Sequence, residues 1–181
     1  MTVMATKYEE ALRLLEEGNK SHADGDTDDA IEKYQRSIEL HPTADAHTYL
    51  GWMLSMKGQI EDAIRHCKIA IELDPDFGNP YNDIGVYLMQ QDKFDEAEEW
   101  LRRAITAKRY QPRHFPHINL GRLFVARRQY TEAMRQFRKA FEQAPEDPTA
   151  ALMLRELVSK LNGSLGTNPF SAERQASGSD D

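Results

Sequence analysis

Cysteine and long apolar runs are almost missing from this chain of 181 residues. Its one cysteine, Cys67, excludes an intramolecular disulfide and any zinc or iron–sulfur site built from several thiolates. No apolar run approaches the roughly 18 residues of a membrane helix. Residues 1–10 also lack the apolar core of a secretory signal. We therefore expect a cytoplasmic chain without membrane insertion.

Motifs of catalysis and nucleotide binding are missing as well. The sequence contains no G-x-S-x-G, no P-loop and no glycine-rich dinucleotide fingerprint. His114 and His117 lie close together, but no nearby cysteine or carboxylate completes the three or four ligands that a metal site needs. We expect no catalytic residue, no metal and no cofactor, and therefore a protein that is not an enzyme.

Acidic residues are scarce in one block of the chain. Residues 102–140 hold 11 Lys and Arg against the single acid Glu132, whereas residues 1–101 hold 9 basic and 22 acidic side chains. The net charge of −7 conceals this segregation. With 40% hydrophobic and 29% charged residues, the composition is that of one folded domain. We therefore expect the basic block, residues 102–140, to affect association with partners more than the fold.

A repeat of 33 to 36 residues organises the sequence. Its anchors are four alanines spaced by 33, 34 and 36 residues: Ala30, Ala63, Ala97 and Ala133. Four positions after each alanine stand Tyr34, Cys67, Leu101 and Phe137. A glycine occupies one upstream slot in every repeat: Gly18, Gly51, Gly85 and Gly121. This pattern predicts two amphipathic helices in each repeat, packed closely where the small residues meet.

The pattern resembles the tetratricopeptide repeat (TPR) family. The resemblance implies an all-α fold: a right-handed superhelix, or α-solenoid, of four helix-turn-helix repeats closed by a C-terminal capping helix. We place a lead-in at 1–10, repeats at 11–43, 44–77, 78–111 and 114–147, the capping helix at 148–162 and a disordered tail at 163–181. Repeat three lacks its terminal proline and two extra residues precede repeat four, so we expect the stacking to change across residues 108–116.

In this family, the first helix of each repeat lines a concave groove that is the usual ligand site. The resemblance places apolar side chains and amides there, which suit aromatic anchoring and hydrogen bonds to a partner's backbone. For Trp52, an exposed anchor and a packing role between repeats both stay open. We expect a protein or peptide partner, held by Asn19, Tyr49, Trp52, Asn82, Val86, Phe115, Asn119 and Arg122.

The best-known groove of the family is a clamp of Lys, Asn and Arg that holds the acidic C-terminal tails of chaperones. Asn19 matches one clamp position, but Leu15, Tyr49 and Asn79 stand where other clamp residues are needed. Asp83 stands in place of a cation and would repel a terminal carboxylate. We therefore do not expect clamp-type binding.

The basic block forms a second candidate surface, for which a solvated face, an acidic protein partner and nucleic acid all stay open. Its candidate residues lie on second helices or in loops: Arg102, Arg103, Arg109, Arg113, Arg127, Arg128, Arg135 and Arg138. One alternative function is a homo-oligomeric scaffold in which acidic N-terminal and basic C-terminal repeats meet. Another is RNA association through residues 102–140, although the overall acidity argues against a nucleic-acid partner.

Overall fold

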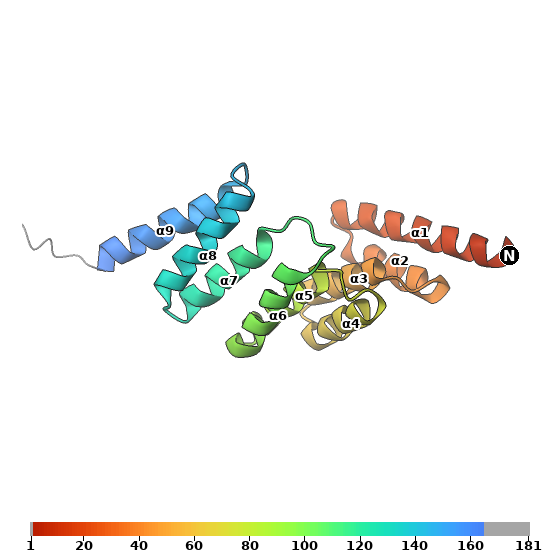
Figure 1. Ribbon diagram of the computed structural model, residues 1–181. Helices are drawn as coiled ribbons and strands as arrows, with labels where there is room; N and C mark the ends of the chain where they lie inside the picture. Colours follow the sequence, from red (N-terminus) through yellow and green to blue (C-terminus); the bar gives the residue numbers. More distant parts are fainter. Residues whose placement is uncertain (1, 165–181) are drawn as a thin grey trace, which may run out of the picture.

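The computed structural model describes residues 2–164, all of whose regular elements are helices. Consecutive helices form pairs joined by short turns, and the pairs stack side by side into an elongated solenoid with α1 at one end and α9 at the other (Figure 1). The helices are α1 (Thr2–Ala23), α2 (Thr27–Leu40), α3 (Ala44–Met56), α4 (Ile60–Leu73), α5 (Asn79–Gln90), α6 (Phe94–Thr106), α7 (Phe115–Ala126), α8 (Tyr130–Gln143) and α9 (Pro148–Ser164). The described residues thus form the predicted all-α superhelix.

Local sequence signals set several helix ends. The Asp26 side chain accepts a hydrogen bond from the Asp29 amide at 3.1 Å and starts α2, and the Thr43 hydroxyl accepts one from the Ala46 amide at 3.1 Å and starts α3. Helices α4 and α8 both end two residues before a proline, because the residue before proline avoids the helical region.

The four anchor alanines are fully buried between the paired helices. The glycines on the first helix of each pair leave no room for a side chain, because the second helix packs directly against them. A Cβ atom on Gly18 would lie 2.5 Å from Cε1 of Tyr34, and one on Gly85 would lie 2.6 Å from Cγ of Leu101. One continuous core runs from Ala30 in α2 to Leu157 in α9. The predicted role of the small residues is confirmed.

The turns inside the four repeats share one left-handed residue. It is Gly25 (φ 84°) and Gly58 (φ 77°) in the first two pairs. At the equivalent positions, the third and fourth pairs hold Asp92 (φ 58°) and Arg128 (φ 60°). The backbone geometry therefore repeats even where the sequence has no glycine, at a conformational cost to those two residues.

The ends of the solenoid differ from the expectation. Helix α1 begins at Thr2, so the residues predicted as a lead-in are mostly helical. Helix α9 continues to Ser164, two residues beyond the expected end of the capping helix. The rest of the predicted tail, residues 165–181, lies outside the described residues. None of the helices between residues 2 and 164 is long and apolar enough to cross a membrane.

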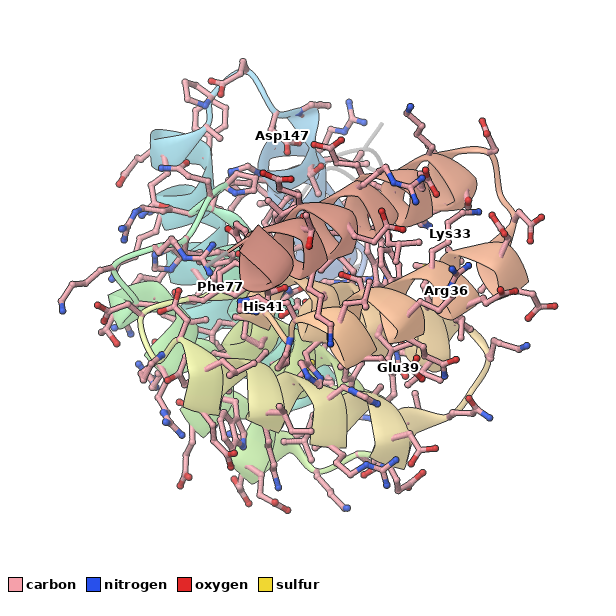
Figure 2. The ribbon with its side chains drawn as sticks, turned by 90° about the vertical axis from the view of Figure 1, so that its right-hand side faces the viewer. Lys33, Arg36, Glu39, His41, Phe77 and Asp147 are labelled. Carbon is pink, nitrogen blue, oxygen red and sulfur yellow. The ribbon has the colours of Figure 1, made fainter. Side chains whose placement is uncertain are left out.

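Charged side chains cover much of the outer surface. Seen from the end where α1 begins, Arg36 and Glu39 project outward from α2 (Figure 2), and both are exposed. Arg13 of α1 binds Glu10 and Glu17 on the same helix, each with an N–O distance of 2.5 Å. Such exposed pairs within one helix contribute little to stability, so the apolar core holds the repeats together.

Candidate functional site

A partly enclosed pocket of about 220 Å³ lies between α3, α5 and the segment that joins α6 to α7. Its lining combines aromatic rings with two amides, a threonine, a proline and one carboxylate. The lining residues are Thr48, Tyr49, Trp52, Asn79, Asn82, Asp83, Tyr110, Pro112 and Phe115. Because α3, α5 and α7 are the first helices of their pairs, the pocket lies on the face that the sequence assigned to the groove.

Four of the eight residues predicted to contact a partner line this pocket together: Tyr49, Trp52, Asn82 and Phe115. The Trp52 ring lies 4.6 Å from the His22 ring, centroid to centroid, yet the residue is 45% exposed. Phe115 is 38% exposed. Two aromatic side chains from α3 and α7 are therefore available to solvent at one pocket.

The other four predicted groove residues do not line the pocket. The Tyr34 hydroxyl donates a hydrogen bond of 2.8 Å to Oδ1 of Asn19, and Val86 packs against the core. Nδ2 of Asn119 donates to Oδ1 of Asn82 at 2.8 Å, so these amides bond each other across α5 and α7. Arg122 lines a separate cavity of about 480 Å³ between α7, α8 and α9.

Residues 107–114 form one wall of the pocket. The Gly78 amide donates to the Arg109 carbonyl at 2.9 Å, and the Arg109 amide donates to the Asp76 carbonyl at 2.9 Å. A Cβ atom on Gly78 would lie 2.6 Å from Cβ of Tyr110, so this glycine lets the wall approach. Sequence reasoning placed a disturbance at residues 108–116 but missed that Tyr110 and Pro112 complete a site. The two extra residues before repeat four and the missing terminal proline of repeat three were the only sequence signals of this wall.

The guanidinium of Arg109 fastens this wall to the second repeat. It lies 3.8 Å from the centroid of the Phe77 ring, and its Nε donates to Oδ2 of Asp74 at 2.8 Å. Its two terminal nitrogens lie 3.4 Å from the carboxylate oxygens of Asp45. An arginine predicted as part of a basic patch is thus held by two acids that precede it by 35 and 64 residues.

Asp83 places a carboxylate in the pocket. It keeps partial contact with solvent, while burial by the surrounding protein raises the pKa of its carboxyl to about 7. Nδ2 of Asn82 lies 3.4 Å from Oδ1 of Asp83, and no ion pair involves Asp83 anywhere in the described part of the chain. Strongly perturbed carboxyl groups in concave sites are candidates for function. From the sequence, Asp83 was expected only to disfavour an acidic ligand.

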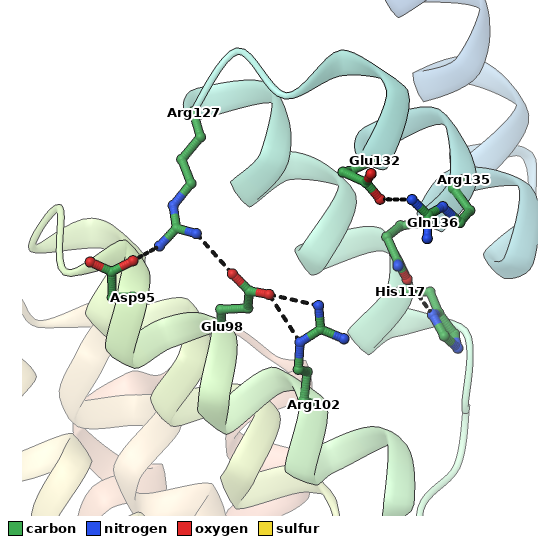
Figure 3. A network of polar contacts seen from close by, with 8 residues as sticks. All are labelled: Asp95, Glu98, Arg102, His117, Arg127, Glu132, Arg135 and Gln136. Carbon is green, nitrogen blue, oxygen red and sulfur yellow. Dashed lines mark hydrogen bonds and ion pairs between the residues drawn. The ribbon is translucent and has the colours of Figure 1, made fainter.

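Most of the predicted basic patch is engaged by groups within the chain. Arg127 binds Oδ1 of Asp95 at 2.5 Å and Oε2 of Glu98 at 2.8 Å, and Glu98 also accepts from Arg102 at 2.6 Å (Figure 3). Further contacts hold Arg103, which lies over the Trp100 and Tyr81 rings, Arg113, which donates to the Lys108 carbonyl, and Arg135, which pairs with Glu132. Within residues 2–164, Arg128 and Arg138 have no ion pair.

The histidines and the cysteine have structural surroundings. Nδ1 of His117 lies 2.8 Å from Oε1 of Gln136, and Nε2 of His114 lies 2.8 Å from Oδ2 of Asp147. Over the described range, no three His, Cys, Asp or Glu side chains are grouped so that they could hold a metal ion. Cys67 is fully buried, which raises the pKa of its thiol well above the ordinary value, so the reactive thiolate is disfavoured.

A stack of helix pairs with a lined concave pocket defines a helical-repeat interaction protein. The family model described as tetratricopeptide repeat matches residues 44–77. The chain belongs to the tetratricopeptide repeat family, whose members are typically non-catalytic scaffolds for protein interactions. A second family model, described as the Est1 DNA/RNA binding domain, matches residues 63–168.

Individual relatives align with part of this chain and extend beyond the aligned residues. An uncharacterized protein of Haemophilus influenzae is 30% identical over 109 residues, which are 60% of this chain and 58% of that protein. The small glutamine-rich tetratricopeptide repeat-containing protein 2 of Mycosarcoma maydis is 33% identical over 96 residues, 52% of this chain and 27% of that protein. The chain therefore spans between about a quarter and three fifths of these two relatives.

Solved structures share the fold. The structure from the functional characterization of Pseudomonas aeruginosa PilF aligns with a TM-score of 0.79 and 22% identity, over 88% of this chain and 72% of that one. The crystal structure of the APC/C hetero-tetramer Cut9-Hcn1 aligns with a TM-score of 0.72 and 18% identity, over 82% of this chain and 30% of that one. At this identity the likeness establishes the solenoid alone.

Proposed function

We propose that the chain is a non-catalytic adaptor that binds a segment of a partner protein in its concave groove, with the pocket of about 220 Å³ as the anchor point. One observation carries the proposal. Tyr49, Trp52, Asn82 and Phe115, chosen from the sequence as partner contacts, come from three helices and line one pocket. Exposed aromatic side chains at a concave site are the usual centres of binding energy in protein interfaces.

The experiment compares two matched double variants in a native lysate of the source cells. Trp52→Ala with Phe115→Ala removes the exposed aromatics of the groove. Leu73→Ala with Phe141→Ala removes side chains of similar exposure, 47% and 41%, from α4 and α8, the second helices of their pairs. Proteins retained by each immobilised variant are quantified by mass spectrometry, and circular dichroism checks helicity.

We expect the groove variant to lose the partner that the wild type retains, by about tenfold or more, since aromatic hot spots typically contribute at least 2 kcal/mol. The control variant should retain it. Equal retention by both double variants would place the partner site outside the groove.

Nucleic-acid binding through residues 102–140 is a second candidate, because the Est1 DNA/RNA binding domain model matches residues 63–168. The internal ion pairs of Arg102, Arg109 and Arg127 weigh against it. Fluorescence anisotropy with a labelled 30-nucleotide single-stranded RNA tests it. Binding that falls steeply between 50 and 200 mM salt and is weakened by Arg128→Ala with Arg138→Ala would support this candidate.

A further inference from the structure

The size of the pocket limits what it can hold. Sites for small molecules and cofactors usually enclose about 300–1,000 Å³, whereas this pocket measures about 220 Å³. It lies on the groove face and opens to solvent beside Trp52 and Phe115, which are both exposed. These dimensions suit one long side chain that enters from a segment lying along the groove.

The carboxylate of Asp83 has hydrogen-bonding capacity that the chain does not use. An ionised carboxylate offers about four acceptor positions. Asp83 receives one long contact, with 3.4 Å between its Oδ1 and Nδ2 of Asn82. The same Asn82 side chain accepts a hydrogen bond from Nδ2 of Asn119 through its Oδ1. Nothing else in the described structure bonds to it as a donor, so most of its acceptor positions remain available to a group that enters the pocket.

Aromatic rings form a large part of the pocket wall. Tyr49, Trp52, Tyr110 and Phe115 line the same pocket as Asp83. Aromatic faces attract cations, and more strongly where water is excluded. They also pack against the methylene stems of Lys and Arg, which bury their apolar part while the charged end seeks a polar partner.

The pocket lacks a charge that would neutralise Asp83 from within. None of the nine residues that line it is Lys, Arg or His. Arg109 adjoins Tyr110 in the wall, but its guanidinium is occupied by Asp45, Asp74 and the Phe77 ring. When Asp83 is ionised, the lining carries a negative charge, which favours a cationic ligand and repels an anionic one.

We propose that the pocket receives the Lys or Arg side chain of a partner segment, whose charged end binds Asp83 while its stem packs against Trp52 and Phe115. This inference rests on the proposed groove function and specifies the chemistry of the partner. The partner is a basic segment, opposite in charge to the acidic tails that the clamp type of groove holds.

Peptide display tests the chemistry without knowledge of the partner. A phage library of random 12-residue peptides is selected on the immobilised wild type, on Asp83→Asn and on Asp62→Asn. Asp62 supplies a matched control, because its carboxylate lies on α4, outside the pocket, and pairs with Arg65. We expect wild type and Asp62→Asn to select peptides with Lys or Arg at one fixed position, and Asp83→Asn to select peptides without that preference.

The failures of the two proposals look different. Peptides that the wild type selects without an enriched Lys or Arg, but that Trp52→Ala with Phe115→Ala no longer binds, would overturn this inference and leave the groove function standing. If the wild type selects no peptide above background, both proposals are contradicted.

A selected peptide then gives the quantitative test by isothermal titration calorimetry. Replacement of its Lys by norleucine, or its Arg by citrulline, removes the charge and keeps the length. We expect affinity for the wild type to fall at least about tenfold, as for other close charge pairs in interfaces. Affinity for Asp83→Asn should change less than about twofold. An equal loss on both proteins would show that the charge does not meet Asp83.

Discussion

Nδ1 of His47 lies 2.9 Å from Nδ1 of His66, where α3 packs against α4. Seventy residues later, the equivalent positions hold His117 and Gln136, whose Nδ1 and Oε1 atoms lie 2.8 Å apart. In the third pair the same positions hold Tyr81 and Trp100, with ring centroids 5.9 Å apart. One helix-pair contact is thus filled by three chemistries, two of which contain histidine and can take up a proton in acid: the His47–His66 pair and His117.

Acidification should weaken the second repeat through this pair. Burial and the neighbouring His66 lower the pKa of His47 to about 4, and burial lowers the pKa of His66 as well. The unfolded histidines have pKa values of about 6.5, so the stability that neutral histidines provide is full above that pH and is lost toward pH 4. We expect the wild type to lose about 2–3 kcal/mol of unfolding free energy from this source.

The variant His66→Gln copies the fourth repeat and should reduce that loss, while stability at pH 7 changes little because Gln can still bond His47. Urea denaturation at pH 7 and pH 4.5 measures the effect. The variant His41→Gln, at an exposed position after α2, is the control and should behave as the wild type. An identical acid loss in the wild type and His66→Gln would refute this role of the pair.

The left-handed turn residues predict an asymmetry between repeats. A side chain in this backbone region costs about 1–2 kcal/mol, less for Asp than for most residues. We expect Arg128→Gly to raise the unfolding free energy by about 0.5–1 kcal/mol and Asp92→Gly to raise it less. Arg135→Gly, inside α8, should instead lower it by about 1 kcal/mol. Urea denaturation tests all three, and destabilisation by Arg128→Gly would contradict the account.

Asp83 should oppose folding when it is charged. Its pKa of about 7 in the folded chain exceeds the unfolded value of about 4, so stability is full below pH 4 and is lost as the pH rises to 7. Its partial exposure keeps the change to about 1–2 kcal/mol. We expect Asp83→Asn to be more stable than the wild type by that amount at pH 8, and equal to it at pH 4. A pH-independent difference between the two would contradict this.

The sequence predicted the fold because the repeat is a packing pattern. Ala30 and its equivalents, and the glycines opposite them, leave room for one helix pair and no other arrangement, so spacing alone identified the four repeats. The resemblance to the family, in which the first helix of each repeat lines the groove, placed Tyr49, Trp52, Asn82 and Phe115 on one face. It could not show that Asn119 bonds Asn82, because that contact depends on how neighbouring pairs stack.

The rest of the site depends on contacts between distant parts of the chain. Tyr110 and Pro112 enter the pocket because residues 107–114 fold back on Gly78, and the repeat pattern contains no information about that segment. Along the sequence, the basic block of residues 102–140 likewise has almost no neighbouring acidic residues to balance its positive charge. Arg109 and Arg127 find their acids in earlier helices, at separations that a local count of charges cannot detect.

Site-specific photo-crosslinking would test the central claim most directly. The photoreactive residue p-benzoylphenylalanine replaces Phe115 in the groove or Phe141 on α8, two phenylalanines of nearly equal exposure, 38% and 41%. Illumination in a lysate of the source cells, followed by mass spectrometry of the crosslinked peptide, identifies what lies against each position. We predict that Phe115 crosslinks to a defined segment containing Lys or Arg, and Phe141 to none. A defined partner at Phe141 and none at Phe115 would place the binding surface on the outer helices.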